Sequence, residues 1–442
     1  MDSTGTTEQY NKGPSIKIID APTGEGKTTS LITYLQNNFN SFQTPIKEQK
    51  RFIVLVPLLD ECERLSKALK ETGIETFTPK IKGRKNKDTL EALREGLNII
   101  TTHRFLEMTP IEFYGTLKDS SERYSYSIFI DEEPTVEVAF KDSPLSNLPS
   151  LDSSDIDTMR HKNIISVDEK SNRITWTAEE PLKGIYRHYR DFFKGYVVYL
   201  SKEAYQYNLD NPFIIHIRPE MWSLFESVTV LSYRVKYSIF RAYCNLYQLP
   251  LDYYHVSRDS DTFVEGYVEK KPKGCKRLCI CKDYLETFRN EEVNIKGLSY
   301  SWYNKTNTKG IKTLRSYMDE CIRNKPFGTI LWTTYKPKKE ALKIPKHGLN
   351  DKNWIACNTK ATNDYKDRTA VIYGINRYMN PFKASFWQSQ GIHIDMDNWS
   401  LNELIQFLWR SNLRDTYSSD TVYVYIPSDR MRGLLEEWLL ND

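Results

Sequence analysis

The stretch "IKIIDAPTGEGKTTSLITYLQN" (residues 16–37) contains, in this order, a short apolar strand pattern, a turn with two glycines and an amphipathic helix pattern. This order is typical of a phosphate-binding loop. In such a loop, consecutive backbone N–H groups and the positive end of the following helix converge on the same anionic oxygens. The alternative is a plain glycine turn between a strand and a helix.

A phosphate loop at this position predicts ATP and Mg²⁺ as cofactors. Lys27 would reach the outer phosphates, and the Thr28 hydroxyl would bind Mg²⁺. Ala21 stands where the general G-x-x-x-x-G-K-[ST] pattern has its first glycine. The predicted nucleotide-binding residues are Thr23, Gly24, Gly26, Lys27, Thr28 and Thr29.

The overall composition excludes several classes of protein. A chain of 442 residues is long enough for two or three domains. Its 62 Lys and Arg residues nearly balance 58 Asp and Glu residues, so any nucleic-acid-binding surface must be local. The seven cysteines are odd in number and scattered, and the N-terminus does not resemble a signal peptide. These features predict a reduced, cytoplasmic protein, in the host cytoplasm if it is viral.

Apolar strand patterns alternate with helix patterns in two parts of the chain, which predicts two parallel α/β sheets with their ligands at the carboxyl ends of the strands. A Ser-, Pro- and Asp-rich stretch followed by a Tyr-rich one interrupts the first part. The predicted division is a flexible arm at 1–14, a first lobe at 15–138 plus 212–250, an insertion at 139–211 and a second lobe at 251–442, with a linker near 251–265.

Two segments allow more than one interpretation. "CKRLCIC" (residues 275–281) lacks the spacing of a zinc site, which favours buried thiols over a metal. The aromatic residues of the insertion interleave with basic ones. They could stack unpaired bases, as part of a strand-separating wedge, or form a core, which is the favoured interpretation. These aromatics are Tyr186, Tyr189, Phe192, Phe193, Tyr196 and Tyr199.

The stretch "IFIDEEP" (residues 128–134) ends an apolar strand with two adjacent carboxylates, about a hundred residues after Lys27. Asp131 could hold the water shell of Mg²⁺, and Glu132 could orient and partly deprotonate the attacking water. The alternative is a solvated acidic strand end.

"APTGEGKTT" and "DEEP" resemble the first and second motifs of superfamily 2 helicases, in which Ala21 is the expected residue. "VPLLDE" (residues 56–61) and "TTHRF" (residues 101–105) are similar to the next motifs in the family's order. "LSYR" (residues 231–234) takes the place of the lobe-coupling S-A-T motif but departs from it at Tyr233 and Arg234. The set is most similar to bacteriophage-encoded members.

In the second lobe, "NTKATNDY" (residues 358–365) resembles the fifth motif and "QFLWRSNLR" (residues 406–414) the sixth. A continuous helix would place Gln406, Arg410 and Arg414 on one face. The resemblance implies two RecA-like lobes in tandem and an arginine finger from this row, with Arg410 favoured and Arg414 supporting.

The resemblance implies an ATP-dependent helicase or translocase that acts on single-stranded or forked DNA, or on RNA, with replication or recombination proteins as partners. The alternatives are an ATP-gated nucleic-acid clamp and a viral packaging motor. The clamp is suggested by "LSYR". A packaging motor would share the phosphate loop and the adjacent carboxylates, but of the acidic cluster of its usual C-terminal nuclease the sequence offers only Asp395 and Asp397. The expected nucleic-acid contacts are Thr102, Arg104, Thr334, Lys80, Lys82 and Arg84.

Overall fold

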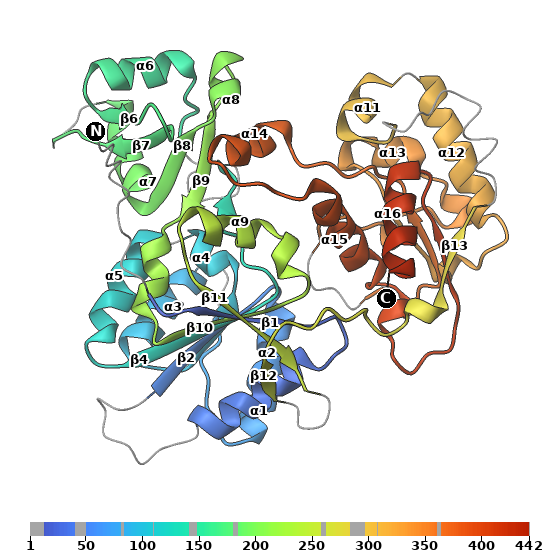
Figure 1. The fold of residues 1–442 in the computed structure, drawn as a ribbon, viewed down its shortest axis with the longest axis horizontal. Coiled ribbons are helices and arrows are strands. Elements are labelled where there is room, and N and C mark those ends of the chain that lie inside the picture. The colour runs from blue at the N-terminus through green and yellow to red at the C-terminus, as the bar shows by residue number, and fades with distance from the viewer. Residues whose placement is uncertain are drawn as a thin grey trace. The chain divides into compact units, whose positions relative to one another are not determined.

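The computed structural model describes residues 13–39, 50–80, 84–108, 110–140, 148–179, 184–257, 262–282, 297–306, 308–359 and 364–441. Backbone contacts divide the chain into two compact units (Figure 1). The first comprises Met1–Ala21, Gly26–Glu269 and Asn380–Ile394, and the second comprises Pro22–Glu25, Lys270–Met379 and Asp395–Asp442. Among the described residues, no helix is long and apolar enough to cross a membrane.

A seven-stranded sheet forms the centre of the first unit, in the order β12-β11-β1-β10-β4-β2-β3. Its strands are β1 (Ile16–Asp20), β2 (Lys50–Val56), β3 (Ile99–Thr102), β4 (Ser125–Asp131), β10 (Ser227–Ser232), β11 (Leu251–Val256) and β12 (Phe263–Glu265). All neighbouring strands are parallel except β11 and β12. The helices of this lobe are α1 (Lys27–Phe39), α2 (Leu59–Glu71), α3 (Lys85–Arg94), α4 (Arg104–Met108), α5 (Pro110–Ser121) and α9 (Ile239–Leu246).

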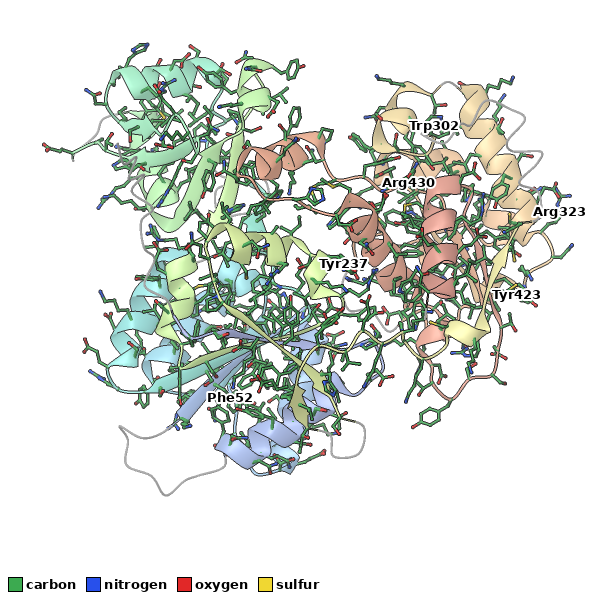
Figure 2. All side chains as sticks on the ribbon, in the orientation of Figure 1. Phe52, Tyr237, Trp302, Arg323, Tyr423 and Arg430 are labelled. Atoms are coloured by element: carbon green, nitrogen blue, oxygen red, sulfur yellow. The ribbon has the colours of Figure 1, made fainter. Side chains whose placement is uncertain are left out.

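The central strands of this sheet read as continuous apolar runs because helices cover both of their faces. In β2 the run from Phe52, which is labelled in Figure 2, to Val56 is fully buried. In β4 the five residues before Asp131 are buried as well. Asp131 is therefore the first polar residue after a buried strand, at the edge where ligands of parallel sheets bind.

The insertion forms a separate five-stranded antiparallel sheet in the order β5-β9-β8-β7-β6. Its strands are β5 (Glu137–Val138), β6 (Ile165–Val167), β7 (Arg173–Trp176), β8 (Tyr196–Leu200) and β9 (Phe213–Ile217), with helices α6 (Ser153–His161), α7 (Arg190–Gly195) and α8 (Lys202–Gln206). Asp152 begins α6 with a reciprocal capping box to Asp155.

The aromatic residues of the insertion form its core. Of the six residues named above, all except the partly exposed Tyr186 are at most 5% exposed. Phe192 packs against Phe193 and Phe213, with ring centroids 4.8 and 5.7 Å away. The core interpretation is confirmed for these five residues, which leaves them unable to stack unpaired bases.

The second unit is built on a four-stranded parallel sheet in the order β13-β16-β15-β14. Its strands are β13 (Leu278–Cys281), β14 (Ile330–Thr333), β15 (Ala370–Tyr373) and β16 (Val422–Tyr425), with helices α11 (Tyr300–Lys305), α12 (Thr308–Ile322), α13 (Lys339–Leu342), α15 (Met396–Leu408) and α16 (Asp429–Leu440). Cys281 is buried in β13, whereas Cys279 is exposed. Two parallel α/β sheets with an insertion in the first lobe confirm the predicted fold class.

Four segments lie elsewhere than the sequence suggested. β5 was assigned to the first lobe, but it pairs with β9 in the sheet of the insertion. β11 and β12 fall in the expected linker, but β11 pairs in parallel with β1 and so extends the first sheet. β9 was assigned to the first lobe, but it pairs with β8 of the insertion. α14 (Pro381–Ser389) was assigned to the second lobe, but it packs in the first unit because Phe386 and Trp387 contact the insertion.

Candidate active site

The loop between β1 and α1 has the backbone of an anion cradle. Gly24 and Gly26 have φ angles of 86° and 83°, in the left-handed region that glycine adopts without strain. α1 begins directly afterwards, at Lys27, so its first free N–H groups and the positive end of its dipole face the loop. The Lys27 ammonium donates to the carbonyl oxygen of Ala21 at 2.6 Å. Lys27 is therefore folded onto the start of its own loop.

The two predicted carboxylates lie at the carboxyl end of β4. Removal from water, together with the neighbouring charge of Glu132, raises the pKa of Asp131 to about 6, while Lys27 acts in the opposite direction. Lys27 and Asp131 are thus close enough to interact through their charges. A divalent cation bound beside Asp131 would offset the free energy cost of charging this carboxylate away from water. These residues therefore fit a nucleotide bound together with Mg²⁺.

Glu132 has an unusual backbone conformation, with a φ of 70°. Left-handed conformations at residues other than glycine cost free energy, and they persist only where the surroundings impose them. Here the N–H of Glu132 donates to the carbonyl oxygen of Leu231 in β10 at 2.8 Å. This bond continues the pairing of β4 with β10, so the left-handed turn at Glu132 begins directly after the last paired residue, Asp131.

Asp20 is a site residue that the sequence analysis missed. It ends β1, is 4% exposed, and accepts the backbone N–H groups of Arg234 and Val235, both at 2.9 Å. Arg234 itself has a φ of 54°. Asp20 therefore fixes the turn after β10 to the strand that leads into the phosphate loop. The only hint in the sequence was an aspartate at the end of a strand directly before that loop.

The "LSYR" stretch has a structural explanation. The guanidinium of Arg234 is buried and lies over the ring of Tyr237, 4.5 Å from the ring centroid (Figure 2 labels Tyr237). Glu269 forms an ion pair with Arg234 at 3.7 Å. Glu133 accepts the N–H of Phe240 at the start of α9 at 2.8 Å. Carboxylates thus hold both Arg234, where the chain departs from the helicase pattern, and the start of the following helix α9.

The residues expected to bind nucleic acid in the first lobe fall into two places. Thr102 is partly exposed at the carboxyl end of β3, and Arg104 is exposed in α4, where it pairs with Glu107 at 3.3 Å. His103, between them, hydrogen bonds through Nε2 to the carbonyl oxygen of Asp131 at 2.7 Å. Lys80 and Arg84 are exposed on a loop away from these residues in sequence, and Lys82 lies outside the described residues.

In the second unit the predicted row of Gln406, Arg410 and Arg414 is not on one helix. α15 ends at Leu408, and Arg414 lies in a short 3₁₀ turn. Ser411 ends the helical run because its hydroxyl accepts the N–H of Leu413. Arg410 is 6% exposed and donates through Nε to the carbonyl oxygen of Gln406 at 3.2 Å.

Arg277, which the sequence analysis did not single out, holds the segment between these two arginines. Its guanidinium donates to the side-chain oxygen of Asn412 at 2.7 Å and to the backbone carbonyl of Asp415 at 2.7 Å. Thr334 follows β14 and is 2% exposed. Residues 360–363 of "NTKATNDY" lie outside the described residues, and the described ends of the stretch precede β15 rather than follow it.

Comparisons with known proteins agree with this architecture. Residues 276–439 match the family model described as the YonV C-terminal Rossmann-like domain. The chain is 28% identical over 441 residues to the SPbeta prophage-derived uncharacterized protein YonV of Bacillus subtilis (strain 168), covering 96% of this chain and 99% of that protein.

Two solved structures are also similar. XPD_APO matches with a TM-score of 0.49 at 13% identity, over 96% of this chain and 95% of that one. The DUF1998 helicase MrfA bound to DNA and AMPPNP matches with a TM-score of 0.36 at 11% identity, over 98% of this chain and 49% of that one.

Proposed function

We propose that this protein is an ATP-dependent nucleic-acid helicase or translocase that couples hydrolysis of Mg-ATP to movement along DNA, or along RNA, or to strand separation. One observation supports the proposal most strongly. A glycine cradle, the ammonium of Lys27 and the carboxylates of Asp131 and Glu132 come together at the carboxyl edge of one parallel sheet. This set supplies the parts that phosphoryl transfer to water requires.

Each part of the site has a definite role in the proposal. The backbone N–H groups from Thr23 to Thr29 hold the phosphates, and Lys27 exchanges the carbonyl of Ala21 for their outer oxygens. Thr28 and, through the water shell of the ion, Asp131 would hold Mg²⁺, which would supply positive charge to neutralise the phosphates. Glu132 orients the attacking water and accepts its proton.

The second lobe would contribute Gln406, Arg410 and Arg414 opposite the phosphates, with Arg410 as the arginine finger. A residue of this kind stabilises charge in the transition state and is worth about 10³ to 10⁵ in rate in GTPases. Arg277 positions the segment between the two arginines. The expected contacts with the strand are Thr102, Arg104, Thr334, Lys80, Lys82 and Arg84, by binding to phosphates.

The setting of the proposal is a phage-related protein in the host cytoplasm, with replication or recombination proteins as partners. The prophage-derived relative in Bacillus subtilis supports the phage origin.

The test is the ATPase rate of the purified protein with no polymer, single-stranded DNA, forked DNA or RNA. We expect strong stimulation by one polymer. Glu132→Gln should lower the stimulated rate by about 10² to 10⁴ while ATP still binds, because only the proton acceptor is lost. Glu122→Gln, at an exposed glutamate after α5, is the matched control and should leave the rate unchanged. The motor function would be refuted if no polymer stimulates the ATPase rate of the native chain and Glu132→Gln has the same rate as Glu122→Gln.

A clamp that uses ATP without processive unwinding is the second candidate. The turn after β10 favours this candidate. It stands where the helicase pattern has its lobe-coupling motif, and its Arg234 is held by Asp20 and Glu269. Displacement of a strand from a duplex with an overhang separates the two functions. A motor displaces the strand in proportion to the ATP it hydrolyses, whereas a clamp hydrolyses ATP without displacement.

A packaging motor has less support, because the carboxylates that suggested its nuclease have structural partners. Asp395 accepts the N–H of Asn398 at 3.0 Å and begins α15. Asp397 pairs with Arg430, labelled in Figure 2, at 2.6 Å. Among the described residues, no group of three or more His, Cys, Asp or Glu side chains could hold a metal ion.

A further inference from the structure

The first unit contains a cavity lined by residues of α1 and of the strands β1, β4, β10, β11 and β12. Figure 1 labels these elements. This cavity has a volume of about 310 Å³. That volume is at the lower end of the range for small-molecule pockets. None of its lining residues belongs to the predicted nucleotide site. We call it the α1 cavity.

The polar residues of the α1 cavity are out of place for the centre of a parallel sheet. Lys17 of β1 lies in register with Thr229 of β10, and both line the cavity. A charged side chain in the middle of a central strand is uncommon, and Lys17 is only partly exposed. In the described part of the chain, the Lys17 ammonium has no ion pair and lies 5.9 Å from the centroid of the Tyr254 ring.

The helix contributes a second set of polar groups. Ser30, Thr33 and Asn37 are spaced along one stripe of α1 and face the same cavity. Ser30 is 1% exposed, and its hydroxyl has no hydrogen-bond partner among the described residues. A buried hydroxyl without a partner destabilises the fold, and a ligand that bonds to it would recover that cost.

The remaining walls are aromatic. The ring of Tyr34 packs against Phe129 and Phe263, with centroids 5.6 and 5.7 Å away, and Tyr254 completes the set. Asn37 and Asn38 are exposed, so they mark the mouth of the cavity. Aromatic walls select a planar ring. The unpaired ammonium of Lys17 selects an anionic group on that ring.

We propose that the α1 cavity is a binding site for a small planar aromatic molecule that carries one anionic group. The ring lies between the aromatic walls, the anion pairs with Lys17, and the Ser30 hydroxyl bonds to the ligand. β1, β4 and α1 line this cavity and also carry the residues of the phosphate loop and Asp131. A bound ligand therefore touches the elements that position the nucleotide site, although it does not occupy that site.

The test uses 2-naphthoate as the probe and neutral 2-naphthamide as its isosteric control, with titration calorimetry on the full chain. We expect one saturable site for 2-naphthoate. Lys17→Met should weaken its binding about tenfold or more, the effect of losing one charge-assisted bond. The same change should leave 2-naphthamide binding unaltered. Lys118→Met, at an exposed lysine on α5, is the matched control and should bind both compounds like the native chain.

Two further variants keep the test decisive. Asn37→Trp blocks the mouth from an exposed helix position, so it should abolish binding of both compounds even if Lys17→Met folds poorly. Lys27→Ala should bind 2-naphthoate normally, because the phosphate loop is a different site. Binding of 2-naphthoate that is lost in Lys27→Ala, unaffected by Asn37→Trp, or absent up to millimolar concentration would overturn the proposal.

Discussion

Asp131→Asn tests the electrostatics of the nucleotide site without any assumption about the nucleic-acid substrate. The pKa of Asp131 is raised from 3.8 to about 6, first by removal from water and then by Glu132. A difference of about two units, at about 1.4 kcal/mol per unit, is worth up to about 3 kcal/mol. Above pH 6 the carboxylate is charged in both the folded and the unfolded state. The free energy cost of charging it inside the folded protein therefore destabilises the folded state.

The sign of the pH dependence follows from the direction of the shift. Between pH 6 and pH 4 the folded protein takes up a proton that the unfolded chain does not hold, so this group makes folding more favourable as the pH falls. The asparagine side chain of the variant carries no charge at any pH. We therefore expect Asp131→Asn to stabilise the first unit at pH 8 by up to about 3 kcal/mol, and to have no such effect near pH 4.

Hydrogen exchange is the appropriate measurement because it reports the opening of β4 apart from the second unit. Protection of the β4 amides should increase in Asp131→Asn at pH 8, and addition of Mg²⁺ and ATP should stabilise the native chain more than the variant. Asp119→Asn, at an exposed carboxylate of α5, is the control and should change neither quantity. An Asp131→Asn variant that is less stable than the native chain at pH 8, or equally stabilised by Mg-ATP, would refute the reasoning.

Four other changes have definite expected outcomes. Lys27→Ala should abolish ATP turnover, because it removes the charge on the outer phosphates; retained turnover would mean that the loop is not the site. Asp20→Ala leaves two buried N–H groups without their acceptor and should cost about 2–4 kcal/mol, seen as faster exchange of the amides of Arg234 and Val235. Arg277→Met should lower polymer-stimulated ATPase more than ATP binding, since it releases the segment that carries the proposed finger; an unchanged ratio would contradict that role. Burial lowers the pKa of His216 to about 3, so between pH 6.5 and 5 only the unfolded chain gains a proton at this residue. The free energy of unfolding should therefore fall by about 2 kcal/mol over this range in the native chain but not in His216→Phe. Hydrogen exchange of the β9 amides measures this difference.

The parts of the fold that local sequence patterns determine could be predicted. β1, β2, β3 and β4 are short apolar runs whose patterns identify them without any knowledge of their neighbours. The loop at residues 21–26 was identified from its glycines, which have the positive φ angles that such a turn needs. The carboxylates of "DEEP" follow a buried strand, and the structure places them at its carboxyl end.

The missed features depend on partners far away in the sequence. β11 (LDYYHV) is neither a continuous apolar run nor a clean alternation, but it pairs with β1 more than 230 residues earlier. The Asp20 carboxylate acts on N–H groups 214 and 215 residues later. The helix expected across residues 406–414 was wrong because the Ser411 hydroxyl caps a new turn, which helical spacing alone does not reveal.

α14 shows what such distant pairing implies for the mechanism. The chain leaves the second unit at Met379, packs α14 against the insertion and returns at Asp395. Trp387 of α14 stacks on His216 at 5.2 Å, and Gln390 donates to the carbonyl of Ser171 at 2.9 Å. Because His216 is buried among aromatic rings, this contact stabilises only the neutral imidazole.

A change in the position of the second unit relative to the first must therefore be absorbed by the backbone on either side of α14, or it must pull α14 from the insertion. α14 belongs to the first unit, and the backbone crosses to the second unit on both sides of it, in addition to the crossing at Glu269. Of the buried aromatic residues of the insertion, Tyr199 packs against Phe386 of α14. If the ATPase cycle moves the lobes, α14 can transmit that movement to the insertion. Loss of the Trp387 contact should then uncouple strand displacement from hydrolysis without lowering the hydrolysis rate.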